Sequence, residues 1–390
     1  MANARLTVWN PLDELTAAAL NAEFNNELSG SVTIAPTGGD DTALIQDAFA
    51  RAVTTGGGSV CFRPGAYSHT GLTLTNVNNL ALYGMGRPGV SGAAGLYCTN
   101  AAADSLKISN GAHIAISGLY IGHSIQSNTG IAAIRALGVN KLSLTDVSTQ
   151  VFPVGSGSMN GLILEGGTSD AVLTWVTRCI FSDHRENGIS LMGSTSTKRV
   201  IETLLSGCVL FANGGAGVRI VDYVAGVYIR NGTNFGVQNG RSIDIVTTVN
   251  DARTLDIFVS DCILDVPVNE NIRAKNVSSV HIFNNWIASA GALSGNVVWG
   301  IDMLTGAANT WLIKDNYIAF NRGGGIRFAG DSSSITGNHF NTNGGLAVTP
   351  TAMELTATST NNFVTSNFFL GHTVSINDLG VANEKTNNHS

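Results

Sequence analysis

Four consecutive charged side chains form the turn of this sequence that is best equipped for chemistry. They follow Phe181 and Ser182 and read Asp183, His184, Arg185 and Glu186. Glycoside hydrolysis requires paired carboxylates, so Asp183 and Glu186 are the first candidates for an acid and a base. Arg185 could hold a sugar carboxylate with two hydrogen bonds, and His184 is a candidate for a second substrate contact. The alternative is a solvated turn whose charges keep the protein soluble.

Three further polar residues come directly after apolar segments on either side of this turn. Glu165 follows residues 162–164, and Asp222 and Tyr223 follow residues 218–220. If the chain winds in coils, these residues belong to neighbouring coils and could converge with the charged turn. We therefore predict Glu165 as the next catalytic candidate, and Asp222 and Tyr223 as substrate-binding residues.

A recurring polar or small residue indicates that the chain does wind in coils. The recurrences are 22 to 33 residues apart, and a hydrophobic residue follows most of them. A period of this length indicates a solenoid, in which each repeat packs on its neighbours. We interpret the cysteines of the series as buried thiols, with a disulfide between Cys179 and Cys208 as the alternative. The series is Gly118, Asp146, Cys179, Cys208, Asn234, Cys262, Asn285, Asn316, Asn338 and Asn367.

Six coils also contain a short triplet in which a polar residue stands between two mostly apolar ones. Side chains alternate between the two faces of a strand, so the middle residues should point outward and stack at about 4.8 Å. Their charges alternate in sign, which favours a ladder of ion pairs; a polar ligand-binding face is the alternative. Catalysis is disfavoured because an arginine beside a carboxylate lowers its pKa. The predicted column is Ser190, Arg219, Asp244, Arg273, Asp302 and Arg327.

Residues 38–75 carry the clearest family signature. They read Asp-Asp-Thr, a helical segment, three glycines, a strand and Pro-Gly-Ala-Tyr. Asp41 is placed to cap the helix, whose buried face should be Ile45, Phe49 and Val53. This order resembles the opening of the pectate-lyase-like superfamily. The resemblance implies an all-β right-handed parallel β-helix over residues 36–370, with a capping helix at its start.

The N-terminal segment resembles a different group of proteins. Residues 15–26 lie in a predicted attachment segment, 1–35, and resemble the first helix of many bacteriophage tail-fibre and tailspike proteins. The resemblance implies a virion protein that forms a homotrimer and contacts other phage tail proteins through residues 1–35. We expect synthesis in the host cytoplasm without a signal peptide, because no such signal precedes the helix. Residues 371–390 are predicted to be a polar tail.

The composition excludes several partners. The 390 residues carry a net charge of -6, which gives no footprint for nucleic acid, and no apolar run is long enough for membrane insertion. The five cysteines lack metal-ligand spacing, and no motif calls for a cofactor. The aspartates 251, 256, 261 and 265 raise a calcium-dependent lyase only as a remote alternative. Trp175, Trp286, Trp299 and Trp311 favour packing over sugar stacking.

The expected function is that of a phage tailspike or tail-fibre subunit. It should bind a bacterial surface polysaccharide and, if it is an enzyme, depolymerise that polysaccharide as an endo-acting glycoside hydrolase. Two alternatives stay open: a secreted or cellular polysaccharide hydrolase or lyase, and a non-catalytic structural virion protein.

Overall fold

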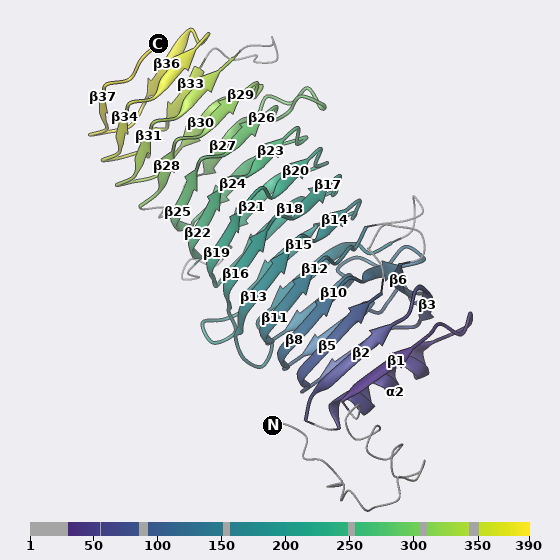
Figure 1. Cartoon of the computed structure of the whole chain (residues 1–390). Helices are drawn as coiled ribbons and strands as arrows, with labels where there is room; N and C mark the ends of the chain where they lie inside the picture. Colours follow the sequence, from purple (N-terminus) through teal and green to yellow (C-terminus); the bar gives the residue numbers. More distant parts are fainter. Residues whose placement is uncertain are drawn as a thin grey trace, which may run out of the picture.

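The chain folds into a long stack of β-coils (Figure 1). The computed structural model describes residues 30–54, 56–85, 93–150, 157–248, 254–304, 310–342 and 351–390. Every pairing between its named strands is parallel, and each strand pairs with its counterpart in the next coil. Successive strands of a coil bury alternate side chains toward one continuous apolar interior. The predicted parallel β-helix is confirmed. The predicted helix in residues 1–29 lies outside the described residues.

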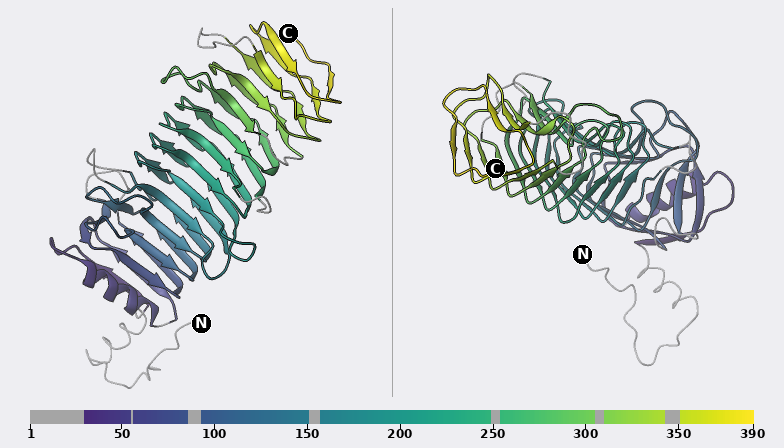
Figure 2. Two further views of the ribbon diagram at one scale, coloured as in Figure 1. Left: turned by 180° about the vertical axis from the view of Figure 1, so that it is seen from behind. Right: turned by 90° about the horizontal axis from the view of Figure 1, so that it is seen from above.

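Three long sheets run the length of the stack, and we name them sheets A, B and C. In each full coil the chain passes from A to B to C and then rises to the next strand of A (Figure 2).

Sheet A has 14 strands: β1 (Ser31–Ile34), β2 (Gly58–Phe62), β5 (Asn78–Gly84), β8 (Ala112–Ser117), β11 (Asn140–Thr145), β13 (Ala171–Thr177), β16 (Val200–Ser206), β19 (Val224–Arg230), β22 (Leu255–Ser260), β25 (Ser278–Phe283), β28 (Leu312–Lys314), β31 (Ser334–Thr336), β34 (Phe363–Thr365) and β37 (Glu384–Thr386).

Sheet C has 12 strands: β4 (Leu72–Thr75), β7 (Leu106–Ser109), β10 (Ala132–Leu137), β12 (Asn160–Glu165), β15 (Ile189–Met192), β18 (Ala216–Val221), β21 (Arg241–Val246), β24 (Ile272–Lys275), β27 (Trp299–Leu304), β30 (Gly324–Phe328), β33 (Thr351–Leu355) and β36 (Val374–Asp378).

Sheet B has eight strands: β14 (Ile180–Ser182), β17 (Val209–Phe211), β20 (Asn234–Gly236), β23 (Ile263–Asp265), β26 (Trp286–Ala288), β29 (Tyr317–Ala319), β32 (His339–Asn341) and β35 (Phe368–Leu370). In the first coils its place is taken by β3 (Gly65–His69), β6 (Ala94–Cys98) and β9 (Tyr120–His123). Two isolated bridges through Ser148 connect this small sheet to sheet B.

The corner between sheets A and B explains the recurring residue of the sequence. In most coils one residue at this corner has a left-handed backbone, which Gly, Asn and Asp adopt at least cost. Asp146, Asn284 and Gly337 are examples, with φ of 53°, 56° and 67°. The residue after the corner points into the core. The predicted series therefore mixed two columns: Gly118 and Asp146 are corner residues, and Asn234 is the residue after the buried Thr233.

The buried column next to this corner holds the cysteines and asparagines. Cys179, Cys208 and Cys262 are at most 2% exposed and all five cysteines are free, so the prediction of core thiols is confirmed and the alternative disulfide does not form. Burial raises the pKa of Cys208 to about 11 and that of Cys262 to about 12. These thiols are therefore inert packing groups at neutral pH.

The first coil is covered by the helix α2 (Thr42–Val53), at the purple end of the stack (Figure 1). Ile45, Ala48, Phe49 and Ala52 form its buried face. The predicted cap is wrong in one detail. Asp41 occupies the N-cap position without a side-chain cap, and the carboxylate of Asp40 accepts the hydrogen bond from the Thr42 N–H at 2.9 Å.

Both predicted domain boundaries differ from the structure. Residues 31–34 form β1, which pairs with β2 and so belongs to the β-helix rather than to an attachment segment. Residues 371–390 form another coil rather than a tail, because β36 extends sheet C and β37 extends sheet A. In that coil Asp378 and Lys385 occupy positions that are apolar in the preceding coil, and they form an ion pair there.

Candidate functional site

The outer face of sheet C carries a column of side chains that is polar at most of its steps. The strand registers place the six predicted residues in line, as expected. The same registers extend the column in both directions, to Lys107, Arg135 and Ile163 before Ser190 and to Glu354 and Asn377 after Arg327. Sheet C therefore presents a polar strip along the whole stack.

Two of the predicted ion pairs form, and both are bidentate. Arg273 donates to the two Asp244 oxygens at 2.7 and 2.9 Å, and Arg327 donates to the two Asp302 oxygens at 2.7 and 2.6 Å. The hydrogen bonds from Asp302 raise the pKa of Arg327. Arg219 is exposed and makes no ion pair with any residue that the structure describes. The alternation of charge thus produces ion pairs between some neighbouring strands and leaves the Arg219 guanidinium outside them.

Replacing Arg273 with Ala should destabilise the protein more than replacing Arg219 with Ala. The Asp244 side chain is only 8% exposed, so loss of Arg273 leaves a nearly buried carboxylate without its bidentate partner. We expect a loss of about 1–3 kcal/mol for Arg273→Ala and about 0.5 kcal/mol or less for Arg219→Ala. Denaturant midpoints of the two variants check this. Equal shifts would contradict the structural role of the pair.

The charged turn 183–186 lies between sheet B and sheet C. Asp183 and Arg185 are exposed, and neither side chain contacts another described residue through a hydrogen bond or ion pair. The left-handed backbone of Asp183 (φ 62°) is not catalytic strain. Ala212 and Phe320 take the same conformation at the same corner of later coils, with φ of 53° and 58°.

His184 points into the molecule and is 1% exposed. Its Nε2 lies 2.9 Å from the Thr149 hydroxyl, and its Nδ1 lies 3.0 Å from the Ser158 carbonyl oxygen. Burial lowers the pKa of His184 to about 4, so the imidazole is neutral at physiological pH. This placement suits a buried connector between coils and leaves no ring nitrogen facing a substrate.

Arg135 and Gly130 connect Glu165 to Glu186 through successive hydrogen bonds. The Arg135 guanidinium contacts Asp104 at 2.8 Å and Glu165 at 2.6 Å, and it also donates to the Gly130 carbonyl. Glu186 accepts a hydrogen bond from the Gly130 N–H at 3.1 Å. Two carboxylates, Asp104 and Glu165, therefore contact the Arg135 guanidinium, and a third, Glu186, is connected to it through the Gly130 backbone. We call Asp104, Arg135, Glu165 and Glu186 the Arg135 cluster.

The remaining predicted residues lie elsewhere. Asp222 and Tyr223 follow β18, at the opposite edge of sheet C from the 183–186 turn. Asp222 is 9% exposed and accepts hydrogen bonds at 2.6 Å from both the N–H and the hydroxyl of Thr248. That pair of bonds holds the next coil in place. The predicted cluster thus separates into the Arg135 cluster and a structural turn at Asp222, although Glu165 starts from the same edge of sheet C as Asp222 and reaches back to Arg135.

The aspartates of the remote lyase alternative also do not form a common site. Asp256 accepts a hydrogen bond from Ser279 within sheet A, Asp261 stands at the A–B corner, and Asp251 lies outside the described residues. Nowhere in the described ranges do three or more His, Cys, Asp or Glu side chains group as metal ligands would.

Sequence reasoning missed Asp104 and Arg135. A signal for Arg135 was available, because Ile134, Arg135 and Ala136 repeat the apolar–polar–apolar triplet of the later coils. The predicted outward column starts at Ser190, whereas the column in the structure starts in earlier coils. Asp104 precedes its strand and carries no such pattern, so only the fold shows that it faces Arg135.

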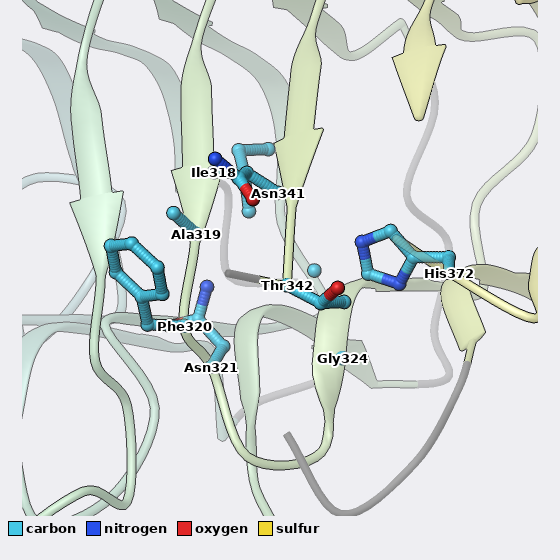
Figure 3. A pocket seen from close by; sticks show the side chains of 9 residues that line it. Ile318, Ala319, Phe320, Asn321, Gly324, Asn341, Thr342 and His372 are labelled. Atoms are coloured by element: carbon cyan, nitrogen blue, oxygen red, sulfur yellow. The ribbon is translucent and has the colours of Figure 1, made fainter. Parts of the chain in front are cut away.

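A shallow pocket lies farther along the stack, where sheet B turns toward sheet C. It is lined by residues of β29, β30 and β32 and by the turns beyond them. Figure 3 shows the rings of Phe320 and His372 on either side of it, with Thr342 between them and Gly324 below. It is small and partly polar, so it suits one edge of a polar ligand.

The outer faces of sheets A and B differ from sheet C because they are apolar. On sheet B, Trp286 stacks on Tyr317 with ring centroids 4.7 Å apart, and His339 and Phe368 continue the column. On sheet A, Tyr228 stacks on Phe258 at 4.9 Å. Trp175 and Trp286 are 37% and 39% exposed, whereas Trp311 is buried as the packing prediction required.

The described residues contain no helix with the length and apolar character needed to cross a membrane. No protein-family model matches the sequence, and no curated protein sequence is significantly similar to it.

Solved structures nevertheless share its fold. The A-module of mannuronan C-5 epimerase AlgE6 from Azotobacter vinelandii superimposes with a TM-score of 0.68 at 12% identity, over 90% of this chain and 95% of that one. DFA-IIIase from Arthrobacter chlorophenolicus A6, solved in complex with DFA-III, gives a TM-score of 0.53 at 14% identity, over 92% and 94% of the two chains.

A phage protein is also among the similar structures. Tailspike gp49 of Acinetobacter baumannii bacteriophage Fri1, a capsular polysaccharide depolymerase, gives a TM-score of 0.53 at 10% identity. The match covers 93% of this chain but only 63% of the tailspike. At such identities the likeness is one of fold. The chain therefore has the parallel β-helix fold found in pectate-lyase-like enzymes and in phage tailspikes.

Proposed function

We propose that the chain is a tailspike subunit that binds a bacterial surface polysaccharide along the outer face of sheet C and hydrolyses it at the Arg135 cluster. The observation that carries the proposal is the cluster itself. Asp104 and Glu165 contact the Arg135 guanidinium, and Glu186 is connected to it through Gly130, on the polar face of a fold that also serves a capsular polysaccharide depolymerase.

The chemistry would use two carboxylates with different roles. Glu186 accepts hydrogen bonds from the Gly130 N–H and from the Asn160 amide, so it is suited to take a proton from the attacking water. Asp183 is exposed and without a protein partner among the described residues, so it is the proposed acid for the departing sugar oxygen. Water adds to the anomeric carbon as the glycosidic bond breaks, which balances the reaction.

Glu165 of the cluster and the neighbouring Arg185 would stabilise charge. Glu165, held at 2.6 Å by Arg135, would face the positive charge that develops on the sugar ring. Arg185 is exposed one residue before Glu186 and would bind a sugar carboxylate. His184, Asp222 and Tyr223 have no part in this scheme, because the structure uses the first two within the fold and places Tyr223 beside Asp222.

The apolar faces support a homotrimer. A threefold ring gives each subunit two neighbours and requires two different, mutually complementary surfaces. Sheets A and B supply two adjacent exposed apolar columns, represented by Trp175 and Tyr228 on A and by Trp286 and Phe368 on B. Packing A against B of the next subunit would bury both and leave sheet C facing outward. Attachment to other tail proteins through residues 1–35 and a location in the virion complete the proposal.

The test is to incubate the protein with purified host surface polysaccharide and to follow chain length by size exclusion together with ultraviolet absorbance. We expect shortened chains without new absorbance, because hydrolysis creates no unsaturated sugar. Glu186→Gln should lower the rate at least about 100-fold, in the range of a lost general base. Glu202→Gln, an exposed glutamate on sheet A, is the matched control and should keep the full rate.

Three outcomes would count against parts of this scheme. Unsaturated products would replace hydrolysis with elimination. A Glu186→Gln variant at full rate would remove the base assignment. Chains that are bound but never shortened would leave a receptor-binding spike without the proposed catalysis.

A further inference from the structure

Trp299 lies flat on the outer face of sheet C. It starts β27 and pairs in register with Gly324 of β30. A Cβ atom on Gly324 would stand 2.4 Å from the Trp299 Cζ3 atom and 2.7 Å from its Cε3 atom, so the ring rests directly on the glycine. The φ of Gly324 is +137°, a conformation that other residues rarely adopt. Part of the ring is therefore covered by the Gly324 backbone, and the side chain as a whole is half-buried.

A charged pair and an apolar rim stand beside this ring. Asp302 and Arg327 lie three residues farther along the same two strands, roughly 10 Å away, and their bidentate ion pair leaves the Arg327 side chain 37% exposed. In the segment that leads into β27, Leu293 and Val297 are 61% and 54% exposed, among the highest values for large apolar residues that the structure describes. An aromatic face, a fixed ion pair and an apolar rim together suit a sugar ring, which has apolar faces and a hydroxyl edge.

The pocket of Figure 3 meets this surface at Gly324, which lines it together with Asn321, Thr342 and His372. The backbone that supports the Trp299 ring is thus also the floor of the pocket. The polar groups of a sugar that packs on Trp299 could bind in this pocket. Two independent features, the ring with its neighbours and the pocket, therefore converge on one residue.

We infer that Trp299, with Asp302, Arg327 and the pocket beside Gly324, forms a second polysaccharide subsite remote from the Arg135 cluster. The inference rests on the proposed function. Five strand spacings of sheet C separate β12 from β27, which is roughly 24 Å. A chain lying along the polar strip would occupy both places at once, and the substrate class is accordingly a long, extended polysaccharide rather than a short oligosaccharide.

Binding of the two positions by one chain also predicts a dependence on length. The second contact becomes intramolecular once the first is made, so long chains should bind more tightly than fragments too short to span the two subsites. Loss of Trp299 should remove this advantage and leave the binding of short fragments at the Arg135 cluster unchanged.

The experiment uses the full chain carrying Glu186→Gln, so that bound polysaccharide is not consumed. An array of purified bacterial capsular and O-antigen polysaccharides identifies a bound chain, and its size fractions are then titrated. We expect Trp299→Ala to weaken binding of long chains roughly tenfold, whereas Trp299→Phe retains most of the affinity. Val381→Ala, an exposed apolar residue of the last coil, is the control and should bind as the parent does.

The outcomes separate this inference from the proposed function. Binding that Trp299→Ala leaves intact for all chain lengths overturns the subsite and leaves the proposed function standing. A parent protein that binds no polysaccharide on the array overturns both. A Trp299→Ala variant with unchanged affinity but an altered oligomeric mass would assign Trp299 to a subunit contact and overturn the subsite as well.

Discussion

Lowering the pH from 7.5 to 4 should remove about 6 kcal/mol from the free energy of unfolding, because buried histidines are kept neutral in the folded protein. His69, His123 and His184 are each at most 1% exposed and lie in the early coils. Burial lowers the pKa of His69 and of His184 from 6.5 to about 4. It also lowers the pKa of His123, against the opposing influence of Asp104. Protonating them in place would require charge in an apolar interior.

The sign follows from the direction of these pKa shifts. Between about pH 4 and pH 6.5 the unfolded chain binds more protons than the folded one, so stability increases with pH across that window. The stabilisation is complete above 6.5 and is lost as the pH falls to about 4. His69 and His184 would each contribute about 3 kcal/mol, since one pKa unit corresponds to about 1.4 kcal/mol. Asp40 and Asp41 oppose the shift of His69 but are outweighed by burial.

Denaturant titrations at several pH values measure this loss. His184→Gln should reduce the pH-dependent loss by about 3 kcal/mol, whatever its effect at pH 7.5, because each variant is compared with itself. His113→Gln is the matched control, since His113 is exposed. Asp170, whose pKa is lowered by hydrogen bonds from Arg199, affects stability mainly below this window. A wild type equally stable at pH 4.5 and 7.5 would contradict the prediction.

The architecture could be predicted because coil-forming features repeat. Each turn of the helix needs a residue that tolerates a left-handed corner and a small or polar residue beside it, so both recur along the sequence. The position within the repeat was harder to predict, because Asn and Asp suit either column. The predicted series therefore contains Asn234, whereas the buried residue of that coil is Thr233. Strand registers resolve such one-residue ambiguities, but the registers cannot be read from a single sequence.

The site was predictable only in part, for a related reason. The triplets indicate which side chains point outward, so the column from Ser190 to Arg327 was predicted correctly. The directions in which long side chains extend from turns produce no periodic pattern in the sequence, so their contacts cannot be predicted in this way. Glu165 and Glu186 are connected only through Arg135 and Gly130 of an earlier coil. His184 looked available in the sequence, but its turn directs it inward to Thr149 and Ser158.

Replacing Asn338 with Ala should cost about 3–6 kcal/mol of unfolding free energy, because its amide connects three coils inside the protein. Its Oδ1 accepts hydrogen bonds from the Asn316 N–H at 3.0 Å and the Asn316 amide at 2.9 Å. Its Nδ2 donates to the Ile313 carbonyl at 2.9 Å and to Asn367 Oδ1 at 3.0 Å. Both Asn338 and Asn367 are fully buried. The variant would leave several of these partners unsatisfied where water cannot replace them.

The penalty should exceed that of an ordinary asparagine because the column is cooperative. The same pattern links Asn285 to Asn316 and Asn367 to Asn388, so each amide supports the corner of the coil before it. Asn128→Ala is the matched control: its side chain is exposed, and we expect a change within about 0.5 kcal/mol. Equilibrium unfolding in urea compares the variants. A shift for Asn338→Ala as small as that of Asn128→Ala would mean that corner geometry and apolar packing, rather than the amide column, hold the C-terminal coils in register.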